Sequence, residues 1–482
     1  MKKTFCRAMG LLLTLCLLVG MLSYLTRVTR LNDEICCYED YVQSLRGYDV
    51  FFLGNSHMLN GVYPMELWAE SGIRAYNLSY SDARMGSLYW ILRCALEKGT
   101  PSVVVLDSYL LESPETVVLP YFQCAFSFFP LSVNKLRAAF ALCPPGEKGL
   151  DETFSLIWSF SQFHSRWPEL RGADFAPGQE LCSRGAIPLV RVAKPDAGVR
   201  TEEALPLDTC PNSACLRRIA ELCRKRNIRL VLTTLPFSPT REEAMAANGA
   251  AALAKELGVE YVNLLDMESL DPEADYYDSI GHLNVSGALK TTRELGRYLR
   301  EECGLPDRRG DTACAEWDTD YLRWRQELAA MLENQPVLQP AWMLLGDPGY
   351  TSVIRIAPGS PLFEDAQTGP LLRNLCGGAA LPGLAEAAAA GQSYLLLSDR
   401  SRGLVAESVG SDTMVTPLGA LRAEPENARL TLGEESFALA VAGDQSKSDA
   451  MCFVFSPDLE PLTACSHAFA RTAEGIYERC DY

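Results

Sequence analysis

Between residues 48 and 304, short apolar runs alternate with longer stretches of helical periodicity. The apolar runs, mostly rich in Val, Ile, Leu or Tyr, are residues 50–53, 74–78, 102–106, 228–235 and 259–264. Amphipathic stretches between or after them are residues 85–98, 214–226, 240–257 and 288–303. Short apolar strands are typical of sheets covered by helices, and strand–helix alternation favours parallel pairing. The pattern predicts an α/β fold, a three-layer α/β/α sandwich around a parallel sheet.

The other regions of the chain lie outside this alternation. Residues 31–46 predict a short polar helix at the start of a sheet domain that we place at residues 31–304. Residues 111–206, rich in Phe, Trp and Pro, predict an insertion within that domain. A linker and helix at 305–336 lead to residues 337–482, where short strand-like runs are separated by Gly and Pro. We expect a smaller α/β or β-rich carboxyl-terminal domain there.

The amino terminus carries an uncharged run of about 19 residues, from 8 to 26, close to the ~20 that cross a bilayer. Lys2, Lys3 and Arg7 precede the run and favour a cytoplasmic amino terminus. No small-residue cleavage site closes the run, so a retained signal anchor at residues 1–30 is preferred to a cleaved signal or a buried helix. The sequence thus predicts a single-pass protein of the cell membrane, with the remaining domains outside the cytoplasm.

The composition excludes one class of partner. The chain has 61 Asp and Glu against 44 Lys and Arg, a net charge of −17, and it has no basic runs. Such a chain repels phosphate backbones, so we expect no nucleic acid partner. The 17 cysteines have no zinc-site spacing and predict a mixture of buried thiols and a few disulfides; we expect no metal.

Two motifs that lie far apart in the sequence contain the candidate catalytic residues. FFLGNSHML places Ser56 just after the first strand, and DYYDSIGHLNVSGA places His282 just before the last helix of the sheet domain. Both positions fall at the carboxyl edge of a parallel sheet, where α/β proteins build their sites. A serine there can act as a nucleophile, a histidine as its general base, and a nearby aspartate can hold the histidine tautomer. The alternative is that Ser56 is a turn hydroxyl or helix cap and His282 a satisfied loop histidine.

GNSH followed by D…HLN…GA resembles the SGNH (GDSL-like) hydrolase superfamily over about residues 48–304. The nearest likeness is to its membrane-anchored bacterial branch, similar to proteins that O-acetylate alginate and other cell-surface polysaccharides. The resemblance implies a flavodoxin-like fold and acyl-ester hydrolysis or transfer without metal or cofactor. It implies Ser56 as the nucleophile, with Asp278 and His282 completing a triad.

The chain departs from the family pattern in the last block. Asp278 and His282 are separated by three residues instead of two, so Asp275 and Asp278 are both possible partners of His282.

The blocks that supply the oxyanion hole in the family also differ. Ser79 or Asp82 stands where a glycine is expected, and Asp107 stands where the third-block asparagine is expected. Asn77 and the backbone N–H of Ser56 are possible substitutes as oxyanion donors.

Three residues near these motifs have open roles. Asn55 and His57 are possible pocket residues, although His57 could equally be a local structural residue. Asp107 could be an electrostatic element at the pocket rim, but capping is the preferred interpretation.

Within the insertion, His164, Arg166 and Trp167 form a candidate sugar-binding group, because tryptophan offers an apolar face and arginine a fork of donors. The alternative is that these residues pack the insertion onto the sheet.

The preferred hypothesis is a membrane-anchored extracytoplasmic serine esterase or O-acyltransferase, most simply an O-acetyltransferase, acting on a cell-envelope or secreted polysaccharide. The rival is a catalytically degenerate glycan-binding or scaffolding partner. A multi-pass membrane O-acyltransferase is a further expected partner, implied by the resemblance. Hydrolysis and transfer share the same serine chemistry, so the residues do not separate them.

Overall fold

The computed structural model describes residues 2–29, 47–127, 129–143, 149–158, 164–172, 183–206, 212–439, 445 and 447–480. The expected polar helix at residues 31–46 lies outside them. The chain forms two compact units. The first comprises Met1–Ile187, Gly198–Asp266 and Thr291–Tyr321, and the second comprises Pro188–Ala197, Met267–Lys290 and Leu322–Tyr482. The division is discontinuous, because the segment that carries the second motif belongs to the same unit as the carboxyl-terminal part.

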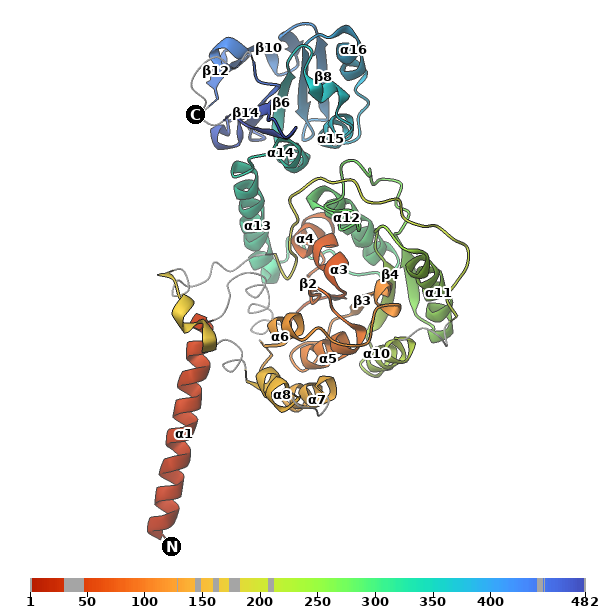
Figure 1. Ribbon diagram of the computed structural model, residues 1–482, viewed down its shortest axis with the longest axis vertical. Coiled ribbons are helices and arrows are strands. Elements are labelled where there is room, and N and C mark those ends of the chain that lie inside the picture. Colours follow the sequence, from red (N-terminus) through yellow and green to blue (C-terminus); the bar gives the residue numbers. More distant parts are fainter. Residues whose placement is uncertain are drawn as a thin grey trace. The chain divides into compact units, whose positions relative to one another are not determined.

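The first unit is built on a five-stranded parallel sheet (Figure 1). Its strands, in the spatial order β2-β1-β3-β4-β5, are β1 (Val50–Leu53), β2 (Ala75–Asn77), β3 (Val103–Asp107), β4 (Arg229–Thr234) and β5 (Glu260–Asn263). Phe52 on β1 lies opposite Asn77 on β2 and Val105 on β3. The strand order reverses direction at β1 and β3, as in doubly wound sheets of the flavodoxin type. The parallel sheet that the sequence predicts is confirmed.

Helices cover this sheet, with α4 on one side and α5 and α10 on the other (Figure 1). They are α3 (Ser56–Gly61), α4 (Pro64–Ser71), α5 (Met85–Ala95), α10 (Ser213–Lys225) and α11 (Arg241–Leu257). Thr240 and Glu243 form a reciprocal capping box at the start of α11, and Gly258 ends it at a φ of +65°. α12 (Val285–Glu301) contains the boundary between the two units, at Lys290.

The insertion is helical where the structure describes it. After η1 (Ser108–Leu111) come α6 (Leu119–Ser127), α7 (Val133–Leu142), α8 (Gly149–Ile157) and η2 (His164–Glu169). Lys135 on α7 is buried, and its ammonium donates to the backbone carbonyls of Ser127 and Phe129. This amine thereby holds the turn between α6 and α7. Residues 188–206 contain neither helix nor strand.

The second unit contains two antiparallel sheets. One has the order β15-β14-β13-β6-β7-β8 and the other β12-β11-β10-β9. The strands of the larger sheet are β6 (Thr351–Ile356), β7 (Tyr394–Asp399), β8 (Leu404–Val409), β13 (Ala450–Phe455), β14 (His467–Arg471) and β15 (Tyr477–Arg479). Those of the smaller sheet are β9 (Thr413–Thr416), β10 (Gly419–Glu424), β11 (Arg429–Leu432) and β12 (Glu435–Ala438). Leu397, Leu430 and Phe453 belong to one apolar core that the two sheets share. The expected β-rich character of this region is confirmed.

The remaining helices and 3-10 turns follow α12 in the sequence. They are η4 (Thr312–Cys314), α13 (Ala315–Glu333), α14 (Leu338–Leu345), η5 (Pro361–Glu364), α15 (Thr368–Leu375), α16 (Pro382–Ala390), η6 (Pro425–Asn427) and η7 (Thr463–Cys465).

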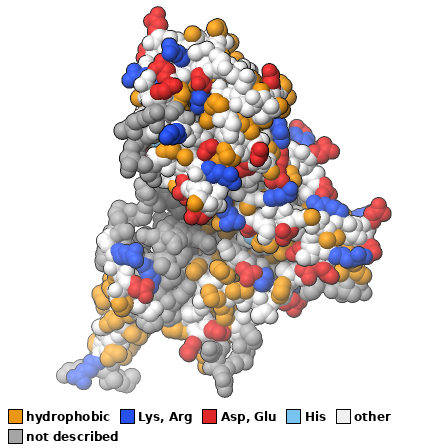
Figure 2. Space-filling view, turned by 45° about the horizontal axis from the view of Figure 1, so that its top comes forward, with side chains coloured by type: hydrophobic (Ala, Val, Ile, Leu, Met, Phe, Trp, Pro, Cys, Tyr) orange, Lys and Arg blue, Asp and Glu red, His pale blue; other side chains and the backbone are white. Residues whose placement is uncertain are grey.

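The amino-terminal run forms one helix, α1 (Lys2–Thr29). Its stretch Phe5–Leu22 is long and apolar enough to cross a membrane, and none of it is buried in the protein. Figure 2 shows the apolar side chains of this helix uncovered, at the lower left. A helix of this kind is consistent with a membrane anchor and also with a signal sequence.

Candidate active site

The serine of the first motif lies on a short helix directly after β1. Asn55 caps α3, because its side-chain Oδ1 accepts a 3.0 Å hydrogen bond from the backbone N–H of His57. Ser56 is partly exposed, whereas Asn55 and His57 on either side are buried. The local structure therefore presents Ser56 at the carboxyl edge of the sheet, beside the point where the strand order reverses, which is where doubly wound proteins bind ligands.

The glycine of the motif is required by close packing. A Cβ atom at Gly54 would lie 2.3 Å from the Cβ of Met58 and 3.1 Å from the Cβ of Asp107. Contacts this short exclude any side chain without a shift of the turn. Gly54 thus lets α3 fold back tightly against the ends of β1 and β3.

Asn77 supports the same turn from β2. It is completely buried, and its Nδ2 donates to the carbonyl oxygens of Met58 (2.8 Å) and Val62 (3.1 Å). Its Oδ1 accepts from the backbone N–H of Ser79 at 3.2 Å. Both N–H bonds of the amide are therefore engaged with the backbone of α3 and the residue after it. In this geometry Asn77 holds the turn and offers no donor to a substrate, so we replace its expected oxyanion role with a structural one.

His57 belongs to an aromatic cluster. Its ring lies 4.8 Å from the ring of Tyr109 and 5.3 Å from that of Phe237, and these two rings are 5.1 Å apart. Of the two roles that the sequence left open, this packing favours the local structural one.

Asp107, at the end of β3, is a fully buried carboxyl group beside the serine turn. Its Oδ1 accepts a 3.0 Å hydrogen bond from the backbone N–H of Tyr109 and so caps η1, as the preferred interpretation of the sequence has it. Among the described residues its Oδ2 has no hydrogen-bond partner. Burial raises the pKa of Asp107 to about 7, although the Tyr109 N–H acts in the opposite direction.

The second motif forms a histidine–aspartate pair in the second unit. The Oδ2 of Asp278 lies 2.7 Å from the Nδ1 of His282. The other carboxylate oxygen accepts from the backbone N–H groups of Gly281 (3.1 Å) and His282 (3.0 Å). The carboxylate is thereby fixed in place, and its contact selects the tautomer that carries a proton on Nδ1 and leaves Nε2 as the basic nitrogen.

Asp275 has a different set of partners. It is completely buried and accepts from Lys290 (2.6 Å), Ser286 (2.7 Å) and Asn374 (3.0 Å) side chains, and from the backbone N–H of Asp271 (2.7 Å). These bonds tie the loop before α12 to α15 within the second unit. Of the two aspartates, Asp278 therefore pairs with His282, and Asp275 is structural.

Residues 188–197 brace the histidine loop. The backbone N–H of Ala193 donates to Tyr276, and that of Asp196 donates to Ser279. The Arg191 side chain donates to the carbonyl of Tyr277 at 2.9 Å and lies 4.8 Å above its ring. The sequence predicts this segment only as part of an insertion.

The sequence analysis does not identify Lys290 as a partner of Asp275, although the spacing of residues on α12 indicates it. Ser286 and Lys290 are four residues apart, so they share one face of α12 and both reach Asp275.

The candidate sugar-binding residues lie on η2, in the first unit. η2 contacts α1, and Trp167 is exposed, whereas Arg166 is partly buried. The side chain of His164 lies outside the described set. The exposure of Trp167 does not fit the alternative in which this side chain packs the insertion onto the sheet.

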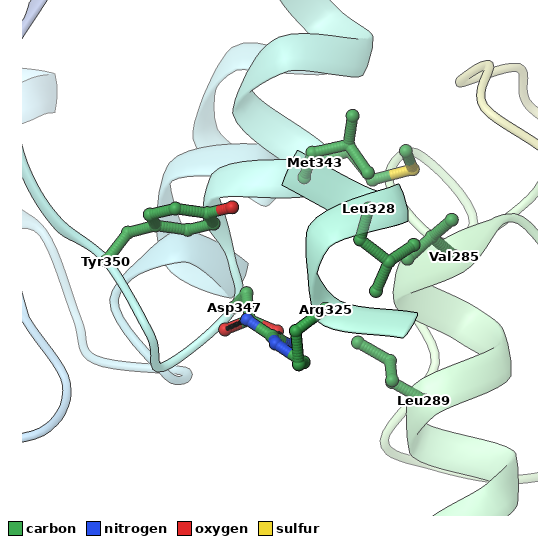
Figure 3. Close-up of a pocket in the computed structure, with 8 residues that line it drawn as sticks. Val285, Leu289, Arg325, Leu328, Met343, Asp347 and Tyr350 are labelled. Atoms are coloured by element: carbon green, nitrogen blue, oxygen red, sulfur yellow. Dashed lines mark hydrogen bonds and ion pairs between the residues drawn. The ribbon is translucent and has the colours of Figure 1, made fainter. Parts of the chain in front are cut away.

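A small pocket in the second unit includes Val285 of the second motif but neither Asp278 nor His282 (Figure 3). Val285 and Leu289 of α12 line it with Leu328, Met343 and the Arg325–Asp347 ion pair. It has room for no more than about one water molecule, which is too small for an acyl sugar.

Among the described residues, no group of three or more His, Cys, Asp or Glu side chains is arranged to hold a metal ion. Cys94, Cys223 and Cys452 are buried free thiols, and burial raises the pKa of each to about 12. Thiols with such pKa values are poor nucleophiles. Ser56 in the first unit and the Asp278–His282 pair in the second unit are the candidate catalytic groups that the two motifs contain. Comparison with known proteins found no family model and no curated protein that matches the chain.

Proposed function

We propose that the chain is a membrane-anchored serine esterase or O-acyltransferase of the SGNH type. The observation that carries the proposal is the 2.7 Å contact between Asp278 and the Nδ1 of His282. A carboxylate held by two backbone N–H groups and directed at Nδ1 is the arrangement that prepares a histidine to act as a general base through Nε2.

The proposed reaction uses Ser56 as the nucleophile. His282 takes the Oγ proton while Oγ attacks the carbonyl carbon of an acyl ester, and the ester C–O bond then breaks as His282 returns the proton to the leaving oxygen. The acyl-serine is resolved by water or by a sugar hydroxyl, whose proton passes to His282 and then back to Ser56. Water as acceptor gives hydrolysis, and a sugar as acceptor gives transfer.

The location supports a glycan of the cell envelope or a secreted polysaccharide as the substrate. α1 is uncovered and apolar over a length sufficient to span a bilayer, and the chain presents a single such helix among the described residues. Retention of this helix would hold both units at the outer surface of the membrane, within reach of surface glycans and of a multi-pass acyl exporter.

The test is the release of p-nitrophenol from p-nitrophenyl acetate by the full-length chain in detergent, beside Ser56→Ala and His282→Ala. The proposal predicts turnover by the wild type and losses of about 10³-fold or more in both variants. Full activity in either variant contradicts it. Ser401, an exposed serine of the second unit outside both sequence motifs, provides the control, and we expect Ser401→Ala to leave the rate unchanged.

The engagement of Asn77 favours a second candidate, a glycan-binding scaffold without turnover, because one expected oxyanion donor is already used within the protein. A scaffold predicts saturable polysaccharide binding that Ser56→Ala leaves unchanged, together with equal, negligible hydrolysis by the two proteins. Isothermal titration with acetylated and deacetylated polysaccharide separates the two candidates.

A further inference from the structure

The insertion of the first unit turns large apolar side chains outward. Leu131, Val133, Phe140, Leu150 and Phe154 are each at least half exposed, from 50% for Phe154 to 78% for Leu150. They come from α7, α8 and the turn before α7, which are neighbours, because α7 and α8 contact each other. We call these five residues the apolar face of the insertion. Large exposed apolar side chains on neighbouring helices are typical of a surface that contacts a partner or a membrane.

On α7 the exposed side chains form a stripe. Val133, Leu136 and Phe140 follow the i, i+3, i+7 spacing of one helix face, and all three are exposed. The opposite face packs inward through Lys135, Ala138 and Ala139. The helix thus presents a stripe of apolar side chains to the solvent.

α8 repeats the arrangement with Leu150 and Phe154, which are four residues apart and both exposed, whereas Thr153 and Leu156 are buried. The Phe154 ring lies 5.7 Å from that of Trp158. Two adjacent helices therefore turn bulky apolar groups toward solvent, which is costly in water unless these groups are covered.

Two observations indicate what covers the exposed apolar side chains of α7 and α8. η2, from the same insertion, contacts α1, and α1 carries the uncovered apolar stretch Phe5–Leu22. Trp167 on η2 is 45% exposed, and tryptophan is enriched where a protein meets the boundary between lipid and water. The chain as a whole is acidic, so apolar burial is a better driving force for lipid contact than attraction to anionic headgroups.

We propose that the apolar face of the insertion docks into the outer leaflet of the membrane that α1 spans. The inference rests on the anchoring part of the proposed function and is independent of the serine chemistry. The docked insertion would hold the first unit against the bilayer by a second contact besides α1, as amphipathic interfacial helices do.

The test is photocrosslinking of the full-length chain in phosphatidylcholine vesicles that contain a phospholipid with a diazirine in its acyl chain, followed by mass spectrometry of the labelled peptides. The proposal expects label on peptides of α1 and on peptides from residues 129–143 and 149–158. Label on α1 alone overturns the inference and leaves the anchor standing. Absence of label from both overturns the anchor as well.

A variant of the apolar face and a matched control test whether this face contacts the lipid. Leu150→Glu with Phe154→Glu changes two exposed side chains, and we expect at least about a fivefold loss of label from residues 149–158 while α1 keeps its label. Val415→Glu, at an 89% exposed apolar residue of the second unit, is the matched control and leaves the labelling unchanged.

A protein crosslinker added to the same vesicles tests the rival occupant, a second copy of the chain. Crosslinks between copies through residues 129–158, without lipid label there, overturn the proposal in favour of self-association. Circular dichroism of each variant confirms that the fold is retained, so a loss of label reports on the surface.

Discussion

Two aspartates three residues apart have different roles in this molecule. Asp278 is held by the backbone and directed at His282, whereas Asp275 is buried among Lys290, Ser286 and Asn374. Spacing along the chain could not separate them, because each lies close enough to His282 in sequence. What separates them is the position of α12 and α15, which bring partners to Asp275 alone.

Substitution of each aspartate by asparagine is predicted to give opposite phenotypes. Asp278→Asn keeps an oxygen for the Gly281 and His282 N–H groups, so the fold survives, but the histidine tautomer is no longer fixed. We expect kcat to fall about 10²- to 10⁴-fold with little change in stability.

Asp275→Asn removes the charge opposite the partly buried Lys290 and is expected to cost roughly 3 kcal/mol or more of unfolding free energy. Ester hydrolysis and urea denaturation of the two variants check both predictions. Loss of activity without loss of stability in Asp275→Asn would contradict the assignment.

Asp107 predicts a pH dependence of stability. Burial raises its pKa to about 7, above the value of about 4 in an unfolded chain, so the folded protein binds the proton more tightly. The contribution of Asp107 is therefore most favourable at low pH and is lost as pH rises from about 4 through about 7. Ionisation at higher pH costs on the order of 4 kcal/mol.

Asp107→Asn cannot ionise, so its stability relative to the wild type should increase over this pH range. Urea denaturation of the two proteins from pH 5 to pH 8 provides the measurement. Parallel pH profiles would show that the Asp107 carboxyl is not perturbed.

At the scale of elements, the serine turn depends on three strands. β1 leads into it, Asp107 at the end of β3 packs against Gly54, and Asn77 on β2 binds the backbone of α3 and Val62. Asn77→Ala leaves two carbonyls and one N–H without their partner in a buried place. We expect a loss of roughly 3 kcal/mol in stability, with activity lost together with the turn.

Asn248→Ala is the matched control for this prediction. The Asn248 amide also donates to two carbonyls, those of Thr201 and Glu203, but it is only partly buried, so water can replace the bonds. Thermal unfolding compares the two variants, and equal losses would mean that Asn77 has no special role.

The strands of the parallel sheet and several of the helices between them could be predicted from the sequence because hydrophobic periodicity is local. The runs at residues 50–53 and 228–235 became β1 and β4, and the Thr240 cap and Gly258 end of α11 stand where the sequence places them. The strand order of the second unit could not be predicted, because β6 pairs with β13 across about 100 residues, and the intervening chain adds β7 and β8 to the same sheet and forms the smaller sheet from β9 to β12.

The candidate residues of the site can be recognised in the sequence, whereas the contacts that support them cannot. Gly54, Ser56 and His282 can be recognised in the sequence because they belong to the two motifs. The hydrogen bonds from Asn77 to Met58 and Val62 depend on tertiary packing and cannot be recognised there. For the same reason the segment at 188–197 carried no sign in the sequence of its contacts with the histidine loop.

At the scale of the whole molecule, the proposed function requires that α1 stay attached to the rest of the chain. Its exposed apolar stretch serves equally as an anchor or as a cleaved signal, and only the anchor keeps the chain on the membrane. We expect the membrane fraction to contain the chain with its residues 2–29 intact, as shown by mass spectrometry of the amino-terminal peptide. A protein in the soluble fraction that begins after residue 29 would contradict the anchor.

The proposed mechanism requires that Ser56 become acylated with the help of His282. The most direct measurement is the mass of the full-length chain, quenched in acid after brief incubation with p-nitrophenyl acetate, with the modified residue located by peptide mapping. We predict one acetyl group on Ser56 in the wild type, and none in Ser56→Ala or His282→Ala. An unmodified wild type, or an acetyl group that persists in Ser56→Ala, would contradict the account.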